Sequence, residues 1–368
     1  AGNDLLIRPG HARTYDYSFT EAGHRQRAAL RFYHDHRLDR TGRNIWRGLV
    51  GMWISDDPFD RGLPLPDGDR DLPLLICDRS FDRHNQLTDP FRDPGRAPFD
   101  QVVGHRILVN GAVTPYHRVE ACRYRLRVLN ASNFRSFNLA VGGGATITQI
   151  GTESGLLPAP LERKRVLIGP AERVDLVVDF SRCAHTDVVL RSVARAHGPN
   201  RVGSRAYEGP LMQFRVAGRP RRDRSHVPSE LRPLPGWVHG APEHVAHEWR
   251  ITVGTGFVPG WRLNDRTYDP GYVDHRVKLG TTEAWRLVND TKVAHVLHLH
   301  HTDWYMLSRN GRRPPPWERG LKETFLLDPG ERVVVAGRFS DYAGKYVVHC
   351  HMLEHEDHGL MSQFATHA

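Results

Sequence analysis

The chain has 368 residues, of which 39% are hydrophobic and 25% charged, and its formal net charge at pH 7 is +9. This length predicts two or three domains with sizeable cores, and the sequence has no run of about 18 apolar residues that would predict a membrane span. The 34 Gly and 25 Pro indicate many turns, which favours an all-β fold.

The first part of the chain, residues 1–57, ends at a linker rich in Pro, Gly and Asp at 58–69. It contains the strand-like run Phe32-Tyr33-His34-Asp35-His36. His34 and His36 are two residues apart, so in a strand their side chains face the same side. A single pair of this kind is usually without function, and its meaning depends on what the rest of the chain supplies.

Two longer segments follow, at 70–217 and 245–368, with a Pro- and Arg-rich linker at 218–244 between them. The densest basic stretch of the chain, Arg219-Pro220-Arg221-Arg222-Asp223-Arg224, lies in this linker and is interrupted by a proline and an acid. Because no aromatic residues are interleaved with it, as they are in proteins that bind single strands, we interpret it as solvated linker charge. We expect neither nucleic acid nor a membrane as a partner.

The two longer segments contain an internal repeat. Residues 167–180 resemble residues 326–339 at an offset of 159, and the same offset aligns 127–130 with 286–289. The repeat predicts two β-sandwich domains built on one plan. When the C-terminal histidines 295, 298 and 300 are shifted back by this offset, they fall on residues that cannot bind metal, namely Ser136, Leu139 and Val141. The histidines are therefore not part of the repeated framework.

Residues 295–301 read His-Val-Leu-His-Leu-His-His. By strand parity, His298 and His300 share one face and His295 lies on the other. Residues 349–355 read His-Cys-His-Met-Leu-Glu-His and follow a strand-like run. Here His349 and His351 point to one side and Cys350 to the other, so one strand can serve two metal centres. His355 lies far enough past Cys350 to turn back beside it.

A thiolate combined with imidazoles suits copper, and two His with one Cys and a weak fourth partner form a blue-copper site. Zinc would favour more cysteines or a CxxC knuckle, and neither is present. The sequence therefore predicts copper. Cys350 is the expected ligand, and the remaining Cys77, Cys122 and Cys183 can form at most one disulfide or are small buried residues.

With these motifs in view, the chain resembles the multicopper oxidases, and within them the three-domain bacterial group that includes spore-coat laccase, bilirubin oxidase and phenoxazinone synthase. The supporting phrases are Tyr-His-Asp-His at 33–36, Gly-Leu-Val-Gly at 48–51 and His-Glu-Asp-His at 355–358. The resemblance covers nearly the whole chain. It implies tandem cupredoxin-like Greek-key β-sandwich domains, with a partial first domain at 1–57, a second without copper ligands at 70–217 and a third with the type 1 copper at 245–368.

The resemblance also implies a ligand set for four coppers in a complete unit. Type 1 copper would be held by His295, Cys350 and His355, and type 2 copper by His298. The type 3 pair would be held by His34, His36, His300, His349 and His351. Electrons would pass from Cys350 through the shared backbone to His349 and His351.

The chain departs from the family in its N-terminal part. The family has an earlier His-x-His pair that supplies one type 2 and one type 3 ligand, whereas only His11 and His24 precede His34 here. The sequence also begins at Ala1 without an initiator Met or signal peptide. We expect the first half of domain one to be missing, with a partner segment or second polypeptide supplying the other ligands. The missing strands would leave an unpaired sheet edge and exposed core.

Two further positions carry open alternatives. The axial position of the type 1 copper, ten residues beyond Cys350, falls on Leu360, which cannot coordinate and would raise the reduction potential. A local bulge would instead bring Met361 there. Glu356 either delivers protons for O₂ reduction, as a carboxylate does in the family, or orients a ligand histidine. The next residues, Asp357 and His358, are expected to be structural or exposed.

The predicted function is a laccase-like copper oxidase that takes single electrons from phenols, aminophenols or similar aromatics and reduces O₂ to water, with Cys350 and Glu356 as catalytic residues. A cuprous-ion oxidase is disfavoured because the chain has only five Met and no Met-rich insert. The alternative is a blue-copper electron carrier or inactive copper-binding protein with an incomplete trinuclear site. About four coppers per unit would indicate the oxidase and about one the carrier.

Overall fold

A computed structural model describes residues 7–21, 23–92, 101–195, 207–218, 223–254 and 260–368. Strands dominate it, which confirms the all-β fold class. Of the basic stretch in the second linker, residues 219–222 lie outside the described residues. No helix within the described ranges is long and apolar enough to cross a membrane.

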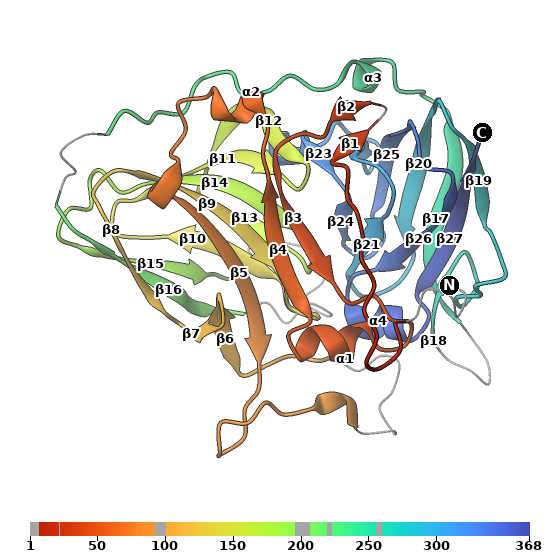
Figure 1. Cartoon of the computed structure of the whole chain (residues 1–368), viewed down its shortest axis with the longest axis horizontal. Coiled ribbons are helices and arrows are strands. Elements are labelled where there is room, and N and C mark those ends of the chain that lie inside the picture. The colour runs from red at the N-terminus through yellow and green to blue at the C-terminus, as the bar shows by residue number, and fades with distance from the viewer. Residues whose placement is uncertain (1–6, 22, 93–100, 196–206, 219–222, 255–259) are drawn as a thin grey trace.

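The N-terminal part forms two small antiparallel sheets and short helices. Its strands are β1 (Thr20–Glu21), β2 (His24–Arg25), β3 (Ala29–His34) and β4 (Val50–Ser55), and its helices are α1 (Thr41–Trp46) and α2 (Pro58–Arg61). Among the described strands, β3 and β4 pair only with each other. In Figure 1 this hairpin, drawn in orange-red, lies between the left and right halves of the molecule.

The left half of Figure 1 contains a seven-stranded and a five-stranded sheet. The first, in spatial order, consists of β12 (Gly155–Arg163), β11 (Thr146–Thr152), β14 (Arg173–Asp179), β9 (Arg123–Asn130), β5 (Asp71–Arg79), β6 (Arg106–Val109) and β7 (Ala112–Val113). The second consists of β13 (Val166–Ile168), β10 (Phe137–Val141), β15 (Asp187–Ser192), β16 (Gly209–Val216) and β8 (Tyr116–Val119). The 3-10 turns η2 (Gly68–Arg70) and η3 (Pro90–Arg92) flank β5.

The right half contains a six-stranded and a five-stranded sheet. The first is formed by β18 (Gly260–Leu263), β17 (Val245–Gly254), β20 (Thr281–Asn289), β25 (Arg332–Phe339), β22 (Trp304–Arg309) and β23 (Leu321–Lys322). The second is formed by β19 (His275–Lys278), β27 (Met361–His367), β26 (Gly344–Cys350), β21 (His295–Leu299) and β24 (Thr324–Leu327). The helices α3 (Gly236–His239) and α4 (Leu353–Asp357) and the turn η4 (Pro316–Glu318) complete this half.

The 159-residue repeat is visible in the contacts of its two copies. The Asn130 amide donates to the carbonyl of Ile168, and the Asn289 amide donates to that of Leu327, at the same offset. Ala171 and Gly330, again at this offset, both have positive φ, of 64° and 76°. Each half also buries its own hydrophobic core. We propose that the two pairs of sheets are the second and third domains, with boundaries near 70–217 and 245–368.

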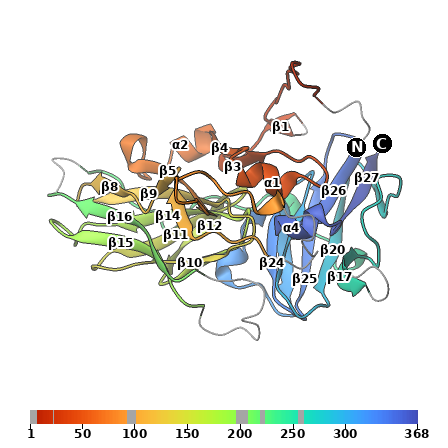
Figure 2. The ribbon, with the colours of Figure 1, turned by 90° about the horizontal axis from the view of Figure 1, so that it is seen from below.

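The parts meet where the predicted ligands lie. Figure 2 shows α1 from the N-terminal part beside α4 from the C-terminal half. Asp357 of α4 accepts hydrogen bonds from the backbone amides of Thr41, at 2.9 Å, and Gly42, at 3.0 Å. A Cβ at Gly42 would come within 2.9 Å of this carboxylate, so only glycine fits without a shift. Asp357 thus has a structural contact, in agreement with the structural role expected as one alternative for it.

Candidate metal centres

Strand β26 carries ligands for two centres because its neighbouring side chains point to opposite faces. It pairs antiparallel with β21, with His349 opposite His298 and Cys350 opposite Leu297. Residues directly opposite each other in such a pair share a face. The imidazoles of His298 and His349 therefore lie on one side of the sheet and the Cys350 thiol on the other.

On the thiol side, Cys350 meets two histidines. Its Sγ lies 3.6 Å from Nδ1 of His295 and 3.7 Å from Nδ1 of His355, and the two Nδ1 atoms are 3.2 Å apart. Helix α4 brings His355 back beside the thiol. The amide of His355 donates to the carbonyl of Met352 at the start of this helix, and the amide of Leu360 donates to the carbonyl of His355 beyond its end. The three side chains thus converge on one point. Strand parity predicted this for His295 and Cys350, and the spacing of His355 after Cys350 allowed it to turn back beside them.

The chemistry of this group fits copper. Cys350 and His295 are fully buried and His355 is 2% exposed. Burial lowers the pKa of His295 to about 3 and raises that of Cys350 to about 12, so the metal-free site holds neutral imidazoles and a thiol. Neutral imidazole is the metal-binding form, and a bound ion would displace the thiol proton. A sulfur and two nitrogens are the donor set of a blue-copper site.

The strand register favours Leu360 for the axial position. Met361 pairs with His349 across β26 and β27, so its side chain lies on the face away from Cys350. Leu360 is fully buried and belongs to the hydrophobic cluster that contains Cys350, whereas Met361 does not belong to it. The pairing begins at Met361 without a bulge, which disfavours the alternative in which Met361 slips toward the thiol.

Two aromatic side chains cover the thiol site, and sequence reasoning did not find them. The Trp261 ring lies 4.6 Å from His295 and 4.7 Å from His355, measured between ring centroids. The Phe134 ring lies 5.5 Å from that of His355. Both aromatics are distant in sequence from the ligands, so no local spacing could have indicated them.

On the opposite face, six histidines from β3, β21, β26 and the loops after them form a cluster. Ring nitrogens approach in pairs: Nε2 of His36 and of His300 each lie 3.2 Å from Nε2 of His349, and the Nε2 atoms of His34 and His351 are 3.4 Å apart. The His298 ring is 4.6 Å from that of His300. Within this cluster, the ligand atoms of His36, His300 and His349 all lie within 4.8 Å of one another, which is close enough for them to bind one metal ion.

Backbone carbonyls hold the second ring nitrogen, Nδ1, of two of these histidines. Nδ1 of His34 lies 2.8 Å from the carbonyl of Asp35, and Nδ1 of His298 lies 2.9 Å from the carbonyl of Glu323. Each contact leaves Nε2 facing the cluster, and hydrogen bonds of this kind orient imidazoles that bind metal. Burial lowers the pKa of His34 to about 4 and that of His298 well below its usual value, which keeps both rings neutral and able to bind metal.

Glu356 lies behind this cluster. Its carboxylate is 2.9 Å from Nδ1 of His349 and 3.5 Å from Nδ1 of His36, and the residue is only 2% exposed. Although burial opposes ionisation, the facing His349 and His36 imidazoles lower the pKa of this carboxyl. This geometry suits a group that orients two ligand histidines. The neighbouring His358 bonds back to the Glu354 carbonyl at 2.6 Å and lies outside both clusters.

Among the described residues, Cys77, Cys122, Cys183 and Cys350 are all buried and free, so none of them forms a disulfide.

The ten predicted copper-site residues, including Leu360, fall into the thiol site and the histidine cluster. No further histidine ring of the described part of the chain contacts His298 beyond His300, His349 and His351. The cluster brings together the six histidines that the resemblance assigns to the trinuclear site.

Comparison with known proteins shows the family to which the chain belongs. Residues 242–368 match the family described as multicopper oxidase. The chain is 35% identical to a laccase of Bacillus subtilis, covering 91% of this chain and 70% of that protein, and 31% identical to a bilirubin oxidase of Albifimbria verrucaria, covering 98% and 63%. The crystal structure of the McoA multicopper oxidase from Aquifex aeolicus superposes with a TM-score of 0.80 at 30% identity, covering 94% of this chain and 77% of that one.

Proposed function

Because the chain belongs to the multicopper oxidase family and is laccase-like, we propose that it oxidises phenols or aminophenols and passes the electrons to O₂. The observation that supports this most directly is the back-to-back arrangement of Cys350 and His349 in β26. Bound copper would supply one-electron redox chemistry beside the thiol and oxygen-reducing chemistry in the histidine cluster. The β26 backbone joins the two sites covalently.

The protein's own residues set the conditions for this chemistry. We propose that His295, Cys350 and His355 would hold the type 1 copper, with the apolar Leu360 rather than Met361 beside them. His298 would hold the type 2 copper, and the type 3 pair would be held by His34, His36, His300, His349 and His351. The apolar residues around Cys350, among them Phe134, Met352 and Leu360, exclude water from the thiol site. Glu356 holds the second nitrogens of His36 and His349, and this contact supports the orienting role for it.

We further propose that a segment outside these 368 residues, in the same or a second polypeptide, supplies the remaining ligands. The β3–β4 hairpin supports this, since both of its outer edges lack a described strand partner. Beside it is a cavity of about 510 Å³ whose lining includes Val50, Met52, Cys77 and Leu108. An open sheet edge next to an apolar surface is normally covered. Intact mass and identification of any co-purifying polypeptide test this part directly.

The second candidate is a carrier that binds a single copper at Cys350 and reduces no oxygen. One observation at His298 favours this carrier. Among the described residues, the only histidine rings that contact His298 are those of His300, His349 and His351, so a second ligand for a copper at His298 is not supplied from outside the cluster. Copper content and oxygen consumption separate the two functions. The oxidase predicts about four coppers per assembled unit, a blue thiolate band with a near-ultraviolet shoulder, and O₂ uptake with a phenol. About one copper and no O₂ uptake would establish the carrier.

A further inference from the structure

The imidazole of His298 is fixed through a peptide group that the opposite half of the molecule holds in place. We propose that Glu153, between β11 and β12, is the positioning residue for His298 of β21. This proposal rests on the assignment of His298 to copper made above. It gives the segment without copper ligands a defined role in shaping the histidine cluster.

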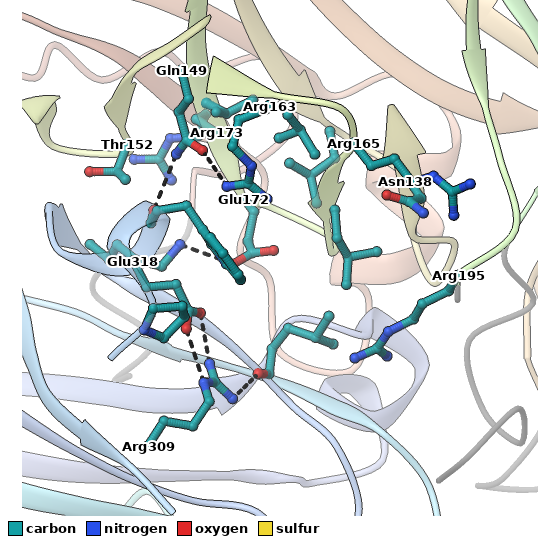
Figure 3. A pocket seen from close by; sticks show the side chains of 18 of the residues that line it. Asn138, Gln149, Thr152, Arg163, Arg165, Glu172, Arg173, Arg195, Arg309 and Glu318 are labelled. Atoms are coloured by element: carbon teal, nitrogen blue, oxygen red, sulfur yellow. Dashed lines mark hydrogen bonds and ion pairs between the residues drawn. The ribbon is translucent and has the colours of Figure 1, made fainter. Parts of the chain in front are cut away.

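The two halves of the molecule are in contact where the hairpin formed by β11 and β12 packs against residues 320–324. The Thr152 hydroxyl and the Ser154 amide both donate to the carbonyl of Leu321, at 2.7 and 3.2 Å. A Cβ at Gly320 would overlap the Thr152 hydroxyl, so glycine permits this close approach. Figure 3 shows the adjoining cavity, with Thr152 and its neighbours from one half facing residues of the other.

Glu153 lies at the tip of this hairpin and is completely buried. One carboxylate oxygen accepts from Nζ of Lys322 at 2.7 Å. The other accepts from the backbone amides of Glu323, at 2.8 Å, and Thr324, at 3.0 Å. A buried carboxylate is tolerated only when it is paired and hydrogen-bonded, and here its partners are the backbone and a side chain of the segment that enters β24.

The link to His298 passes through a single peptide unit. The amide of Thr324 is held by Glu153, and the carbonyl of the same peptide, that of Glu323, lies 2.9 Å from Nδ1 of His298. The peptide is planar, so fixing its N–H fixes the direction of its C=O. The same carbonyl accepts from the Leu299 amide at 2.9 Å, and the Thr324 hydroxyl lies 3.2 Å from His298 Nδ1.

This arrangement sets the tautomer of His298. The carbonyl can only accept, so Nδ1 carries the proton and Nε2 keeps its lone pair toward the cluster. Glu153→Gln leaves one acceptor oxygen where there were two, so it can serve either Lys322 or the amides of Glu323 and Thr324 but not both, and the Lys322 ammonium draws this oxygen to itself and leaves the amide NH₂ facing the two backbone donors. Unsatisfied buried donors drive local rearrangement. The peptide would turn to satisfy them, and the His298 ring would lose its fixed orientation.

Glu172 provides a matched control at the same interface. Its carboxylate accepts from Lys322 Nζ at 3.0 Å, and its other oxygen accepts from the amide of Gly169 at 2.7 Å. Glu172 is also buried and shares Lys322 with Glu153, but it bonds backbone of its own half. A general loss of charge or of interface stability would affect the protein whether Glu153 or Glu172 is replaced. A change in the orientation of His298 would be seen only when Glu153 is replaced.

The test uses metal-free, ¹⁵N-histidine-labelled protein, in which the Nδ1–H resonance of His298 is assigned by its loss in His298→Gln. We expect Glu153→Gln to shift or broaden this resonance and to speed amide exchange of Leu299 by about tenfold or more. Glu172→Gln should change neither. Glu153→Asp, which keeps the charge beside Lys322 but is one methylene shorter, should behave like Glu153→Gln and serves if the latter does not fold.

Copper loading provides a second readout. Glu153→Gln should lower the copper retained by the histidine cluster, while the blue absorption of the Cys350 site stays unchanged. An unshifted His298 resonance in both Glu153 variants, or an equal shift in Glu172→Gln, would overturn the proposal. If the unchanged protein binds only one copper, the proposed oxidase function fails, and the metal-free resonance still decides the role of Glu153.

Discussion

Cys350 and His349 are consecutive residues of β26, yet Cys350 lies within 3.7 Å of His295 and His355 while His349 lies within 3.2 Å of His36 and His300. One peptide bond therefore connects two separate groups of potential metal ligands. Strand alternation and the pairing of β26 with β21 place His349 and Cys350 on opposite faces, while α4 brings His355 to the thiol and the loop after β3 brings His36 to His349.

The thiol of Cys350 should be indispensable for the blue colour. Cys350→Ser replaces a copper thiolate ligand by a hydroxyl, so we expect loss of the thiolate absorption and of about one copper per chain. Absorption spectra and copper content measure both effects. Cys122→Ser, at a buried cysteine of the other half, is the control and should keep the blue band; a blue Cys350→Ser protein would exclude this residue as the ligand.

Leu360→Met should lower the reduction potential of the thiol site. A thioether in the axial position donates electron density to the oxidised ion, and this ligand tunes the potential. Redox titration of the blue band measures the shift. The control is Met361→Leu, which should leave the potential unchanged because Met361 pairs with His349 on the other face. A shift in Met361→Leu with none in Leu360→Met would mean that the positions are reversed.

Asp357→Ala should loosen α1 from α4. The carboxylate accepts from the amides of Thr41 and Gly42, and its loss leaves these donors unpaired, at a cost of about 2 kcal/mol in the free energy of local opening. Hydrogen exchange of the amides in residues 41–46 measures this. Asp290→Ala removes only an exposed ion pair with Arg250 and should leave α1 unaffected. Unchanged exchange in Asp357→Ala would show that other contacts hold the helix.

His247 should make the metal-free protein less stable at acid pH. Burial, followed by repulsion from His275, lowers its pKa to about 4 from 6.5, and its ring stacks on that of His275 at 4.5 Å. Between these values the unfolded chain binds a proton that the folded chain does not. Stability is therefore lost as the pH falls from about 6.5 to 4, by on the order of 2 kcal/mol.

Urea unfolding at pH 7 and pH 5 tests this expectation. His247→Gln should unfold with about one proton less taken up, so its stability should fall less between the two pH values than that of the parent protein. The titratable groups that act on His247 are His275, Asp274, Glu283 and Glu248. Equal pH dependence in both proteins would show that the titration of His247 is compensated by these neighbours.

Local periodicity was sufficient to predict much of the candidate site. Strand parity placed Cys350 and His349 on opposite faces, because side-chain alternation needs no knowledge of the tertiary fold. It left the choice between Leu360 and Met361 open, since α4 and the following turn interrupt the alternation, and only the pairing of Met361 with His349 favours one of them. Trp261 and Glu153 were not predicted at all, because their contacts join strands from distant parts of the sequence.

Anomalous diffraction at the copper absorption edge, on crystals of the copper-loaded protein, tests the central claim most directly. We predict one peak between Cys350, His295 and His355, and further peaks among His36, His300, His349 and their neighbours on the other face of β26. A Cys350 sulfur without a peak beside it, or peaks on one face of the strand only, would contradict the assignment of two copper centres joined by this strand.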